Sequence, residues 1–198
     1  AFYSYSAQNL IVKGDVNVAS GAYFNIKRNA NFTNQLTIYG SMNVDGELNF
    51  VNGNQEVATT FTGTADASIK GAGNITLYTL TCDKGSNATP VLSIERNITA
   101  TYQGGVFLNL LNGTFRADGE GVNIDITRDS DLDIASTACL SVKAGTFNVC
   151  NTNNHDRNVL LHGKIEVLGG DLNIGNGGGN DIECSLSQSY IDVQGGTL

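Results

Sequence analysis

The chain has 198 residues, a formal net charge of −8, one proline and no tryptophan. Its 11 Lys and Arg residues are spread along the chain, which argues against nucleic-acid binding, because that requires clustered positive charge. Because 40% of the residues are hydrophobic and only 15% are charged, the chain is too apolar for a disordered segment. It has no apolar run of about 18 residues and no basic amphipathic helix, which excludes membrane insertion.

One short pattern of alternating apolar and polar residues recurs along the whole chain, every ~25 residues. It first appears at Ala22-Tyr23-Phe24-Asn25-Ile26 and is complete for the last time at Gly170-Asp171-Leu172-Asn173-Ile174. Such alternation is typical of a half-buried strand. Seven apolar side chains of this first ladder are therefore expected to stack in one buried file: Phe24, Leu48, Ile75, Ile98, Val122, Phe147 and Leu172.

Two further ladders of apolar pairs run in step with the first. The second comprises Val16/Val18, Met42/Val44, Ala67/Ile69, Leu92/Ile94, Phe115/Ala117, Leu140/Val142, Ile165/Val167 and Ile191/Val193. The third comprises Leu10/Val12, Leu36/Ile38, Phe61, Leu80/Cys82, Leu108/Leu110, Leu132/Ile134, Val159/Leu161 and Cys184/Leu186.

Three short strands per repeat predict an all-β fold, a three-sided parallel β-helix with ~25-residue coils. Right-handed coils are expected, because crossovers between parallel strands are right-handed. An antiparallel sandwich also contains many short strands, but it gives no reason for the same core positions to return at this period. Residues 1–198 are expected to form a single β-helix segment. Since Leu198 falls on a core position, we expect a fragment of a longer repeat protein without its caps.

The longer connections between strands gather at one corner, after the first ladder. They are residues 27–35, 51–60, 101–106, 125–131, 150–158 and 175–181, and a separate insertion at residues 83–90 opens another corner. Insertions in repeat proteins often mark the binding face. Binding is therefore expected at the Asn-rich edge formed by residues 151–156 and 176–181.

A file of polar residues occupies the outward position of the first ladder. Its members are Asn25, Asn49, Thr76, Thr99, Asn123, Asn148 and Asn173. Stacked amides hydrogen-bond along such a file. The file is either a polar surface for a glycan or another chain, or simply a solvated ladder.

Three alternating carboxylates, Asp129, Asp131 and Asp133, face one way on an extended segment and are a candidate Ca²⁺ site. The segment has neither the central Gly nor the twelfth-position Glu of an EF-hand loop, so a solvated acidic corner is the expectation. No metal or cofactor is assigned.

His155, Asp156, Arg157 and His162 lie close together in the sequence, which by itself does not establish the geometry of acid–base catalysis. No catalytic residue is assigned. Cysteines 82, 139, 150 and 184 are expected to be thiols, with Cys82 and Cys184 inward and a Cys139–Cys150 disulfide as the alternative.

The chain resembles the large β-solenoid surface proteins of bacteria, such as autotransporter passengers and filamentous-haemagglutinin-like adhesins. The resemblance is carried by Gly14-Asp15-Val16-Asn17-Val18 together with Gly21-Ala22-Tyr23-Phe24-Asn25-Ile26, by Leu36-Thr37-Ile38-Tyr39-Gly40, and by Gly170-Asp171-Leu172-Asn173-Ile174. It implies export, display on the extracellular bacterial cell surface, and adhesion or scaffolding. Polysaccharide lyases and polygalacturonases share the architecture, but Leu161-His162-Gly163 departs from the Gly-His-Gly of polygalacturonases.

We therefore expect a secreted structural or adhesive module without catalytic activity. Its partners would be other segments of the same or a neighbouring surface protein, and glycans or a host surface. A non-catalytic carbohydrate-binding module of a larger polysaccharide-active protein is the first alternative. A pectate-lyase-like enzyme is the second.

Overall fold

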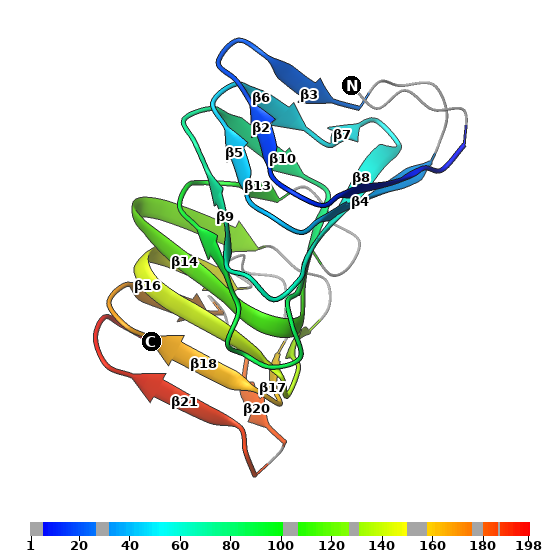
Figure 1. The fold of residues 1–198 in the computed structure, drawn as a ribbon. Coiled ribbons are helices and arrows are strands. Elements are labelled where there is room, and N and C mark those ends of the chain that lie inside the picture. The colour runs from blue at the N-terminus through cyan, green and yellow to red at the C-terminus, as the bar shows by residue number, and fades with distance from the viewer. Residues whose placement is uncertain are drawn as a thin grey trace.

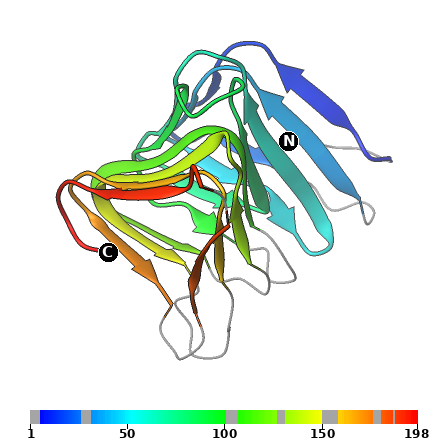
Figure 2. The same cartoon turned by 90° about the horizontal axis from the view of Figure 1, so that it is seen from below.

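The computed structural model describes residues 6–26, 32–100, 107–126, 131–149, 158–175, 180–185 and 187–198. All regular structure in these residues is β-strand, and the strands stack in parallel as a β-solenoid. In Figure 1 the chain advances along the stack from the blue N-terminal coils to the red C-terminal coils. Figure 2 views this stack from below, with the last coils in front. The predicted all-β parallel solenoid is confirmed.

Within the described residues we find no helix long and apolar enough to cross a membrane.

Each predicted ladder becomes one face of the solenoid. The first face contains β3 (Tyr23–Asn25), β6 (Glu47–Asn49), β10 (Asn74–Leu77) and β13 (Thr99–Ala100), followed by the ends of β14 (Leu108–Ile126) and β16 (Ala138–Val149) and by β19 (Asp171–Ile174). The second face contains β2 (Val16–Val18), β5 (Met42–Val44), β9 (Ala67–Lys70), β12 (Val91–Ile94), the middle of β14, the start of β16, β18 (Lys164–Val167) and β21 (Tyr190–Val193).

The third face contains β1 (Asn9–Val12), β4 (Thr33–Ile38), β8 (Gln55–Thr62), β11 (Thr79–Asp83), the start of β14, β15 (Leu132–Ile134), β17 (Val159–Leu161) and β20 (Ile182–Cys184). One short antiparallel pair adjoins it, between β7 (Val51–Asn52) and the start of β8. Residues 51–60 were predicted to be a connection, and this was wrong. The alternating pattern of β8 buries Gln55, Val57, Thr59 and Phe61, so the segment extends the third face.

Two coils in the later half of the stack do not consist of three separate short strands. β14 and β16 run without interruption around a corner, as the long curved bands in Figure 1 show. The start of β14 pairs with β11 on the third face, and its middle pairs with β12 on the second. The expectation of three short strands per coil was wrong here because hydrogen bonding continues through the corners.

The register of the ladders is confirmed at most steps and differs by two residues at three of them. Ile124, and not Val122, pairs with Phe147. Met42 pairs with Ile69 in place of Ala67. Leu161 pairs with Cys184, whereas the sequence pattern placed Val159 opposite Cys184.

Corner length explains the first two differences. Ahead of Ile124, the chain makes a wide corner at Gly119-Glu120-Gly121, where Gly121 adopts a φ of 73°. Phe61 pairs with Ile38 and Ile69 pairs with Met42, so the corner from Phe61 to Ile69 stacks on the corner from Ile38 to Met42. The corner from Phe61 to Ile69 is the longer of the two. In both cases the strand re-enters its face later than a constant period predicts.

The interior of the solenoid is a single continuous hydrophobic core. Phe61, Phe115 and Phe147 are fully buried in it. The rings of Phe115 and Phe147, from adjacent coils, pack edge to face with centroids 5.9 Å apart. Such pairs contribute roughly 0.5–1.5 kcal/mol beyond the burial of their area.

Corner Asp and Asn side chains connect one coil to the next. The Asp15 Oδ1 accepts the backbone N–H of Ser41 at 2.7 Å, and the Asp45 Oδ1 accepts that of Ala72 at 3.0 Å. The Asp66 Oδ1 similarly accepts the N–H of Val91 at 2.9 Å. These bonds satisfy backbone donors where the ladder is interrupted, which explains why Asp recurs at the corners.

Candidate functional site

Three members of the polar file of the first face form a hydrogen-bonded amide ladder, as the sequence predicted. The Asn148 Nδ2 donates to the Asn123 Oδ1, and the Asn173 Nδ2 donates to the Asn148 Oδ1, both at 2.8 Å. Near the other end of the face, the Asn25 Oδ1 accepts the backbone N–H of Asn49 at 3.1 Å. Backbone register sets Asp125 opposite Asn148, so the Asn148 side chain reaches diagonally to Asn123.

A hollow of about 460 Å³ lies on the first face. Its lining includes Asn49, Thr76 and Thr99 from the file, together with Glu47 and Arg96. A hydrogen bond positions the Arg96 side chain, because its Nη1 donates to the Gly71 carbonyl oxygen at 2.5 Å. The polar file is therefore hollowed at this end and is not flat along its whole length.

The acidic corner is solvated in the part that the structure describes, where Asp131 and Asp133 both point outward beside buried Leu132 and Ile134. The Asp131 Oδ1 accepts the backbone N–H of Asn158 at 2.9 Å. Asp129 lies outside the described residues. Among the residues that are described, no group of three or more His, Cys, Asp or Glu side chains is placed to hold a metal ion.

His162 contacts an acidic residue that is distant in sequence. Its Nδ1 lies 2.9 Å from the Asp133 Oδ1 of the preceding coil. The two side chains are 32% and 62% exposed, so the contact is at the surface. His155, Asp156 and Arg157 lie outside the described residues, as do most of the two segments expected to form the Asn-rich binding edge.

The described cysteines are free thiols. Cys82 is buried, as predicted, and burial raises the pKa of its thiol to about 12. Cys139 is also a free thiol, and Cys150, its partner in the alternative disulfide, lies outside the described residues. Cys184 was predicted to be inward, but it is exposed because β20 has a paired strand on one side only among the described residues.

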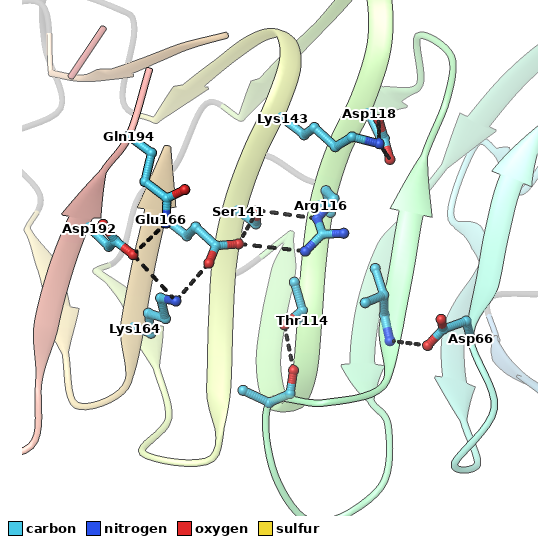
Figure 3. A network of polar contacts seen from close by, with 12 residues as sticks. Asp66, Thr114, Arg116, Asp118, Ser141, Lys143, Lys164, Glu166, Asp192 and Gln194 are labelled. Atoms are coloured by element: carbon cyan, nitrogen blue, oxygen red, sulfur yellow. Dashed lines mark hydrogen bonds and ion pairs between the residues drawn. The ribbon is translucent and has the colours of Figure 1, made fainter. Parts of the chain in front are cut away.

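A network of charged side chains crosses the second face, on successive strands (Figure 3). Arg116 on β14 donates from Nε to the Ser141 Oγ of β16 at 3.2 Å, and its Nη2 lies 3.5 Å from the Glu166 Oε2 of β18. The Ser141 hydroxyl in turn donates to the Glu166 Oε2 at 3.0 Å. The three residues are spaced by 25 positions, one per coil.

Lys164 completes this charged network on the side of β21. Its Nζ donates to the Glu166 Oε1 at 2.6 Å and lies 3.9 Å from the Asp192 Oδ2. The same Nζ stands 5.1 Å from the centroid of the Tyr190 ring, within the range of a cation–π contact. Farther along the face, Lys143 forms a separate ion pair with Asp118 at 3.0 Å.

The ionic contacts of the charged network fix its protonation. The hydrogen bond to Glu166 raises the pKa of the Lys164 ammonium above its usual value, against the opposing effect of burial. Burial alone would raise the pKa of the Glu166 carboxyl. The hydrogen bonds from Lys164 and Ser141 and the charges of Lys164 and Arg116 outweigh burial, so that this pKa lies below its ordinary value. Both groups are charged at neutral pH.

The charged network lines a groove between the second face and the insertion at residues 83–90. One hollow, of about 270 Å³, is lined by Ala88, Thr89, Val91, Thr114, Arg116, Cys139, Lys164, Glu166 and Tyr190. The next, of about 380 Å³, is lined by Ala88, Ser136, Thr137, Ala138, Gly163, Lys164, Gln188 and Tyr190. The two hollows share Ala88, Lys164 and Tyr190 and therefore adjoin, and we call them together the insertion groove.

The wall of the insertion groove is anchored. The Thr114 hydroxyl donates to the Ala88 carbonyl oxygen at 2.6 Å, and the backbone N–H of Gly85 donates to the Gly63 carbonyl oxygen at 3.0 Å. Lys84, which is fully buried, donates from Nζ to the Thr62 carbonyl oxygen at 3.1 Å. These bonds tie the insertion to two neighbouring segments, β14 and the end of β8 with the residue that follows it.

The insertion is recognisable in the sequence, but the side chains that face it were not predicted. Arg116, Ser141 and Glu166 are the outward residues between the apolar pairs of the second ladder. The alternation that identifies the polar file of the first face therefore identifies this file also.

Comparison of the chain with protein-family models, with curated proteins and with solved structures finds no match.

Proposed function

We propose that this chain is a structural and adhesive β-solenoid module, secreted and displayed on the bacterial cell surface, that binds its partners without catalysis. The observation that carries the proposal is the bonding of outward side chains from coil to coil. The Asn123–Asn148–Asn173 ladder and the Arg116–Ser141–Glu166 file give the rod two continuous, ordered polar surfaces. Rigid surfaces of this kind suit contact with an extended partner.

The electrostatics of the second face favour binding over reaction. A general acid or base works best with a pKa near the operating pH. The pKa of Lys164 is raised and that of Glu166 is lowered, so both move away from neutrality. These contacts hold the two groups in their charged forms and make them suitable for recognition of a polar partner.

The resemblance to bacterial β-solenoid adhesins supports the extracellular location and the choice of partners. These partners would be neighbouring segments of a surface protein and glycans or a host surface. A carbohydrate-binding module of a larger polysaccharide-active protein is the second candidate, favoured by the hollows on the first and second faces.

The purified chain should bind immobilised glycans or host-cell surfaces and should leave a panel of acidic and neutral polysaccharides intact. Binding is measured by surface plasmon resonance and turnover by the release of reducing ends. The double variant His155→Ala, His162→Ala serves as the reference for any turnover that is seen.

Two results would contradict the proposal. One is turnover of a polysaccharide that the double histidine variant abolishes, which would establish an enzyme. The other is failure to bind any glycan or cell surface while the chain is folded.

A further inference from the structure

The insertion groove is long enough for an extended ligand. Its lining comes from β12, β14, β16, β18 and β21, which are consecutive strands of the second face. Neighbouring strands lie about 4.8 Å apart, so these strands span roughly 19 Å along the rod. A chain-like ligand lying along the rod axis would contact one coil after another.

The side chains of the groove offer both hydrogen bonds and an aromatic surface. Thr89, Ser136, Thr137 and Gln188 line it beside the charged network, so that hydroxyl groups occur in both hollows and a side-chain amide, that of Gln188, occurs in the larger one. Tyr190 lines both hollows and is 52% exposed. An aromatic ring among a few placed polar groups is the usual composition of a small-molecule site.

The charge of the groove differs from the charge of the chain. The chain carries a net −8, but the charged residues that line the two hollows are Arg116, Lys164 and Glu166. Two cations therefore face one carboxylate. Asp192 flanks Lys164 at 3.9 Å but lines neither hollow.

The two cations are also positioned in advance. The side chains of Arg116, Lys164 and Glu166 are 23%, 21% and 14% exposed, so they are partly shielded from solvent. Glu166 bonds both cations, Lys164 on its own strand β18 and Arg116 on β14 across the intervening strand β16, and both line the same hollow. Charge-assisted hydrogen bonds to an anionic group are stronger when the donors are held in place and partly desolvated.

We infer that the insertion groove binds a short saccharide that carries carboxylate groups, with Arg116 and Lys164 facing a carboxylate and Tyr190 contacting a sugar ring. This inference rests on the proposed adhesive role and names the ligand class and the residues that recognise it. The site differs from the Asn-rich edge predicted from the sequence and from the hollow on the first face.

The test compares a uronic-acid trimer with the methyl ester of the same trimer, titrated into the purified chain by isothermal calorimetry. The two probes have the same sugar chain, and in the ester each carboxylate is replaced by an uncharged methyl ester. The chain should bind the acid and bind its ester at least about tenfold more weakly, because the neutral ester cannot form ion pairs with Arg116 and Lys164. Raising the salt concentration should weaken binding of the acid.

The Lys164→Gln variant should lose at least about tenfold in affinity for the acid. Lys143→Gln is the matched control, since it removes one positive charge from the same face but lies outside both hollows. Tyr190→Ala, which changes a half-exposed side chain, should weaken binding without unfolding the chain. Melting followed by circular dichroism establishes that each variant is folded.

Equal binding of the acid and its ester, equal losses in Lys164→Gln and Lys143→Gln, or no binding of the acid would each overturn the inference. If the variants bind normally while the chain still adheres to glycans or cells, the inference fails and the adhesive function stands. If adhesion to every surface is absent as well, the proposed function fails.

Discussion

A glycine at a corner shows how closely the coils are stacked. Gly145 has a φ of 78°, and an added Cβ would lie 2.4 Å from the carbonyl oxygen of Val122 in the previous coil. Gly121 has a similar φ of 73°, but an added Cβ there meets nothing within 4 Å. The two positions differ in packing while sharing nearly the same backbone conformation.

Gly145→Ala should therefore destabilise the chain more than Gly121→Ala. The Gly121 variant carries only the cost of a left-handed alanine, about 1 kcal/mol, whereas the Gly145 variant adds an overpacking cost of roughly 1–3 kcal/mol. Denaturant unfolding measures both values. Equal losses in the two variants would show that the coils are not in the contact described.

Lys84 is a fully buried lysine at the start of the insertion. Burial lowers the pKa of its ammonium below the ordinary 10.5, and the opposing charges of Cys82 and Asp66 are weaker effects. Between the lowered pKa and 10.5, the folded chain binds fewer protons than the unfolded chain. Stability from this residue therefore rises with pH across that window.

Lys84→Met should remove that rise. The free energy of unfolding of both chains is measured from pH 7 to 10.5. As pH increases, the original chain should become more stable relative to the variant. Subtracting the variant removes the contributions of other titrating groups. A difference that does not change with pH would contradict the burial of a charged lysine at this corner.

At the scale of the element, the amide ladder of the first face connects β14, β16 and β19. Asn148 is its middle member, only 5% exposed, and it both donates and accepts a ladder bond. Asn173 is exposed and makes one of these bonds at the end of the ladder. The ladder is thus expected to stabilise the stack mainly through its buried member.

Asn148→Ala should cost about 1–3 kcal/mol, because it removes two bonds and leaves the Asn173 amide without its ladder acceptor. Asn173→Ala, the control, should cost less than 1 kcal/mol, roughly the value of one exposed bond. Chemical denaturation distinguishes them. A loss in Asn173→Ala as large as that in Asn148→Ala would argue against a buried ladder.

At the scale of the whole molecule, apolar side chains are exposed on the outermost strands of the stack. Leu10 and Ile11 on β1 are 40% and 53% exposed, and Val193 on β21 is 50% exposed. Strands with a partner on one side only present unpaired N–H and C=O groups. A polypeptide of residues 1–198 should therefore self-associate through these strands.

Multi-angle light scattering should give a mass that increases with protein concentration. Val193→Lys should reduce this association, because a charge on an edge strand opposes pairing. Thr64→Lys adds the same charge at an exposed corner and should have little effect. A strictly monomeric chain at every concentration would refute the prediction.

The sequence by itself determined which side of each strand turns toward the interior of the solenoid. In a strand, successive side chains point to opposite faces, so the alternating pairs of the second and third ladders identify inward positions without reference to any other coil. Val16/Val18 with Met42/Val44, and Leu10/Val12 with Leu36/Ile38, pair as expected. The outward files, including the amide ladder, follow from the same alternation.

Only the tertiary structure decided which inward residues meet. A shift of two residues keeps every side chain on its own face, so the hydrophobic pattern cannot distinguish Val122 from Ile124 as the partner of Phe147. The lengths of the corners made that choice. The insertion groove depends on the same information, since the anchored position of residues 83–90 against the charged network results from contacts between coils that are distant in sequence.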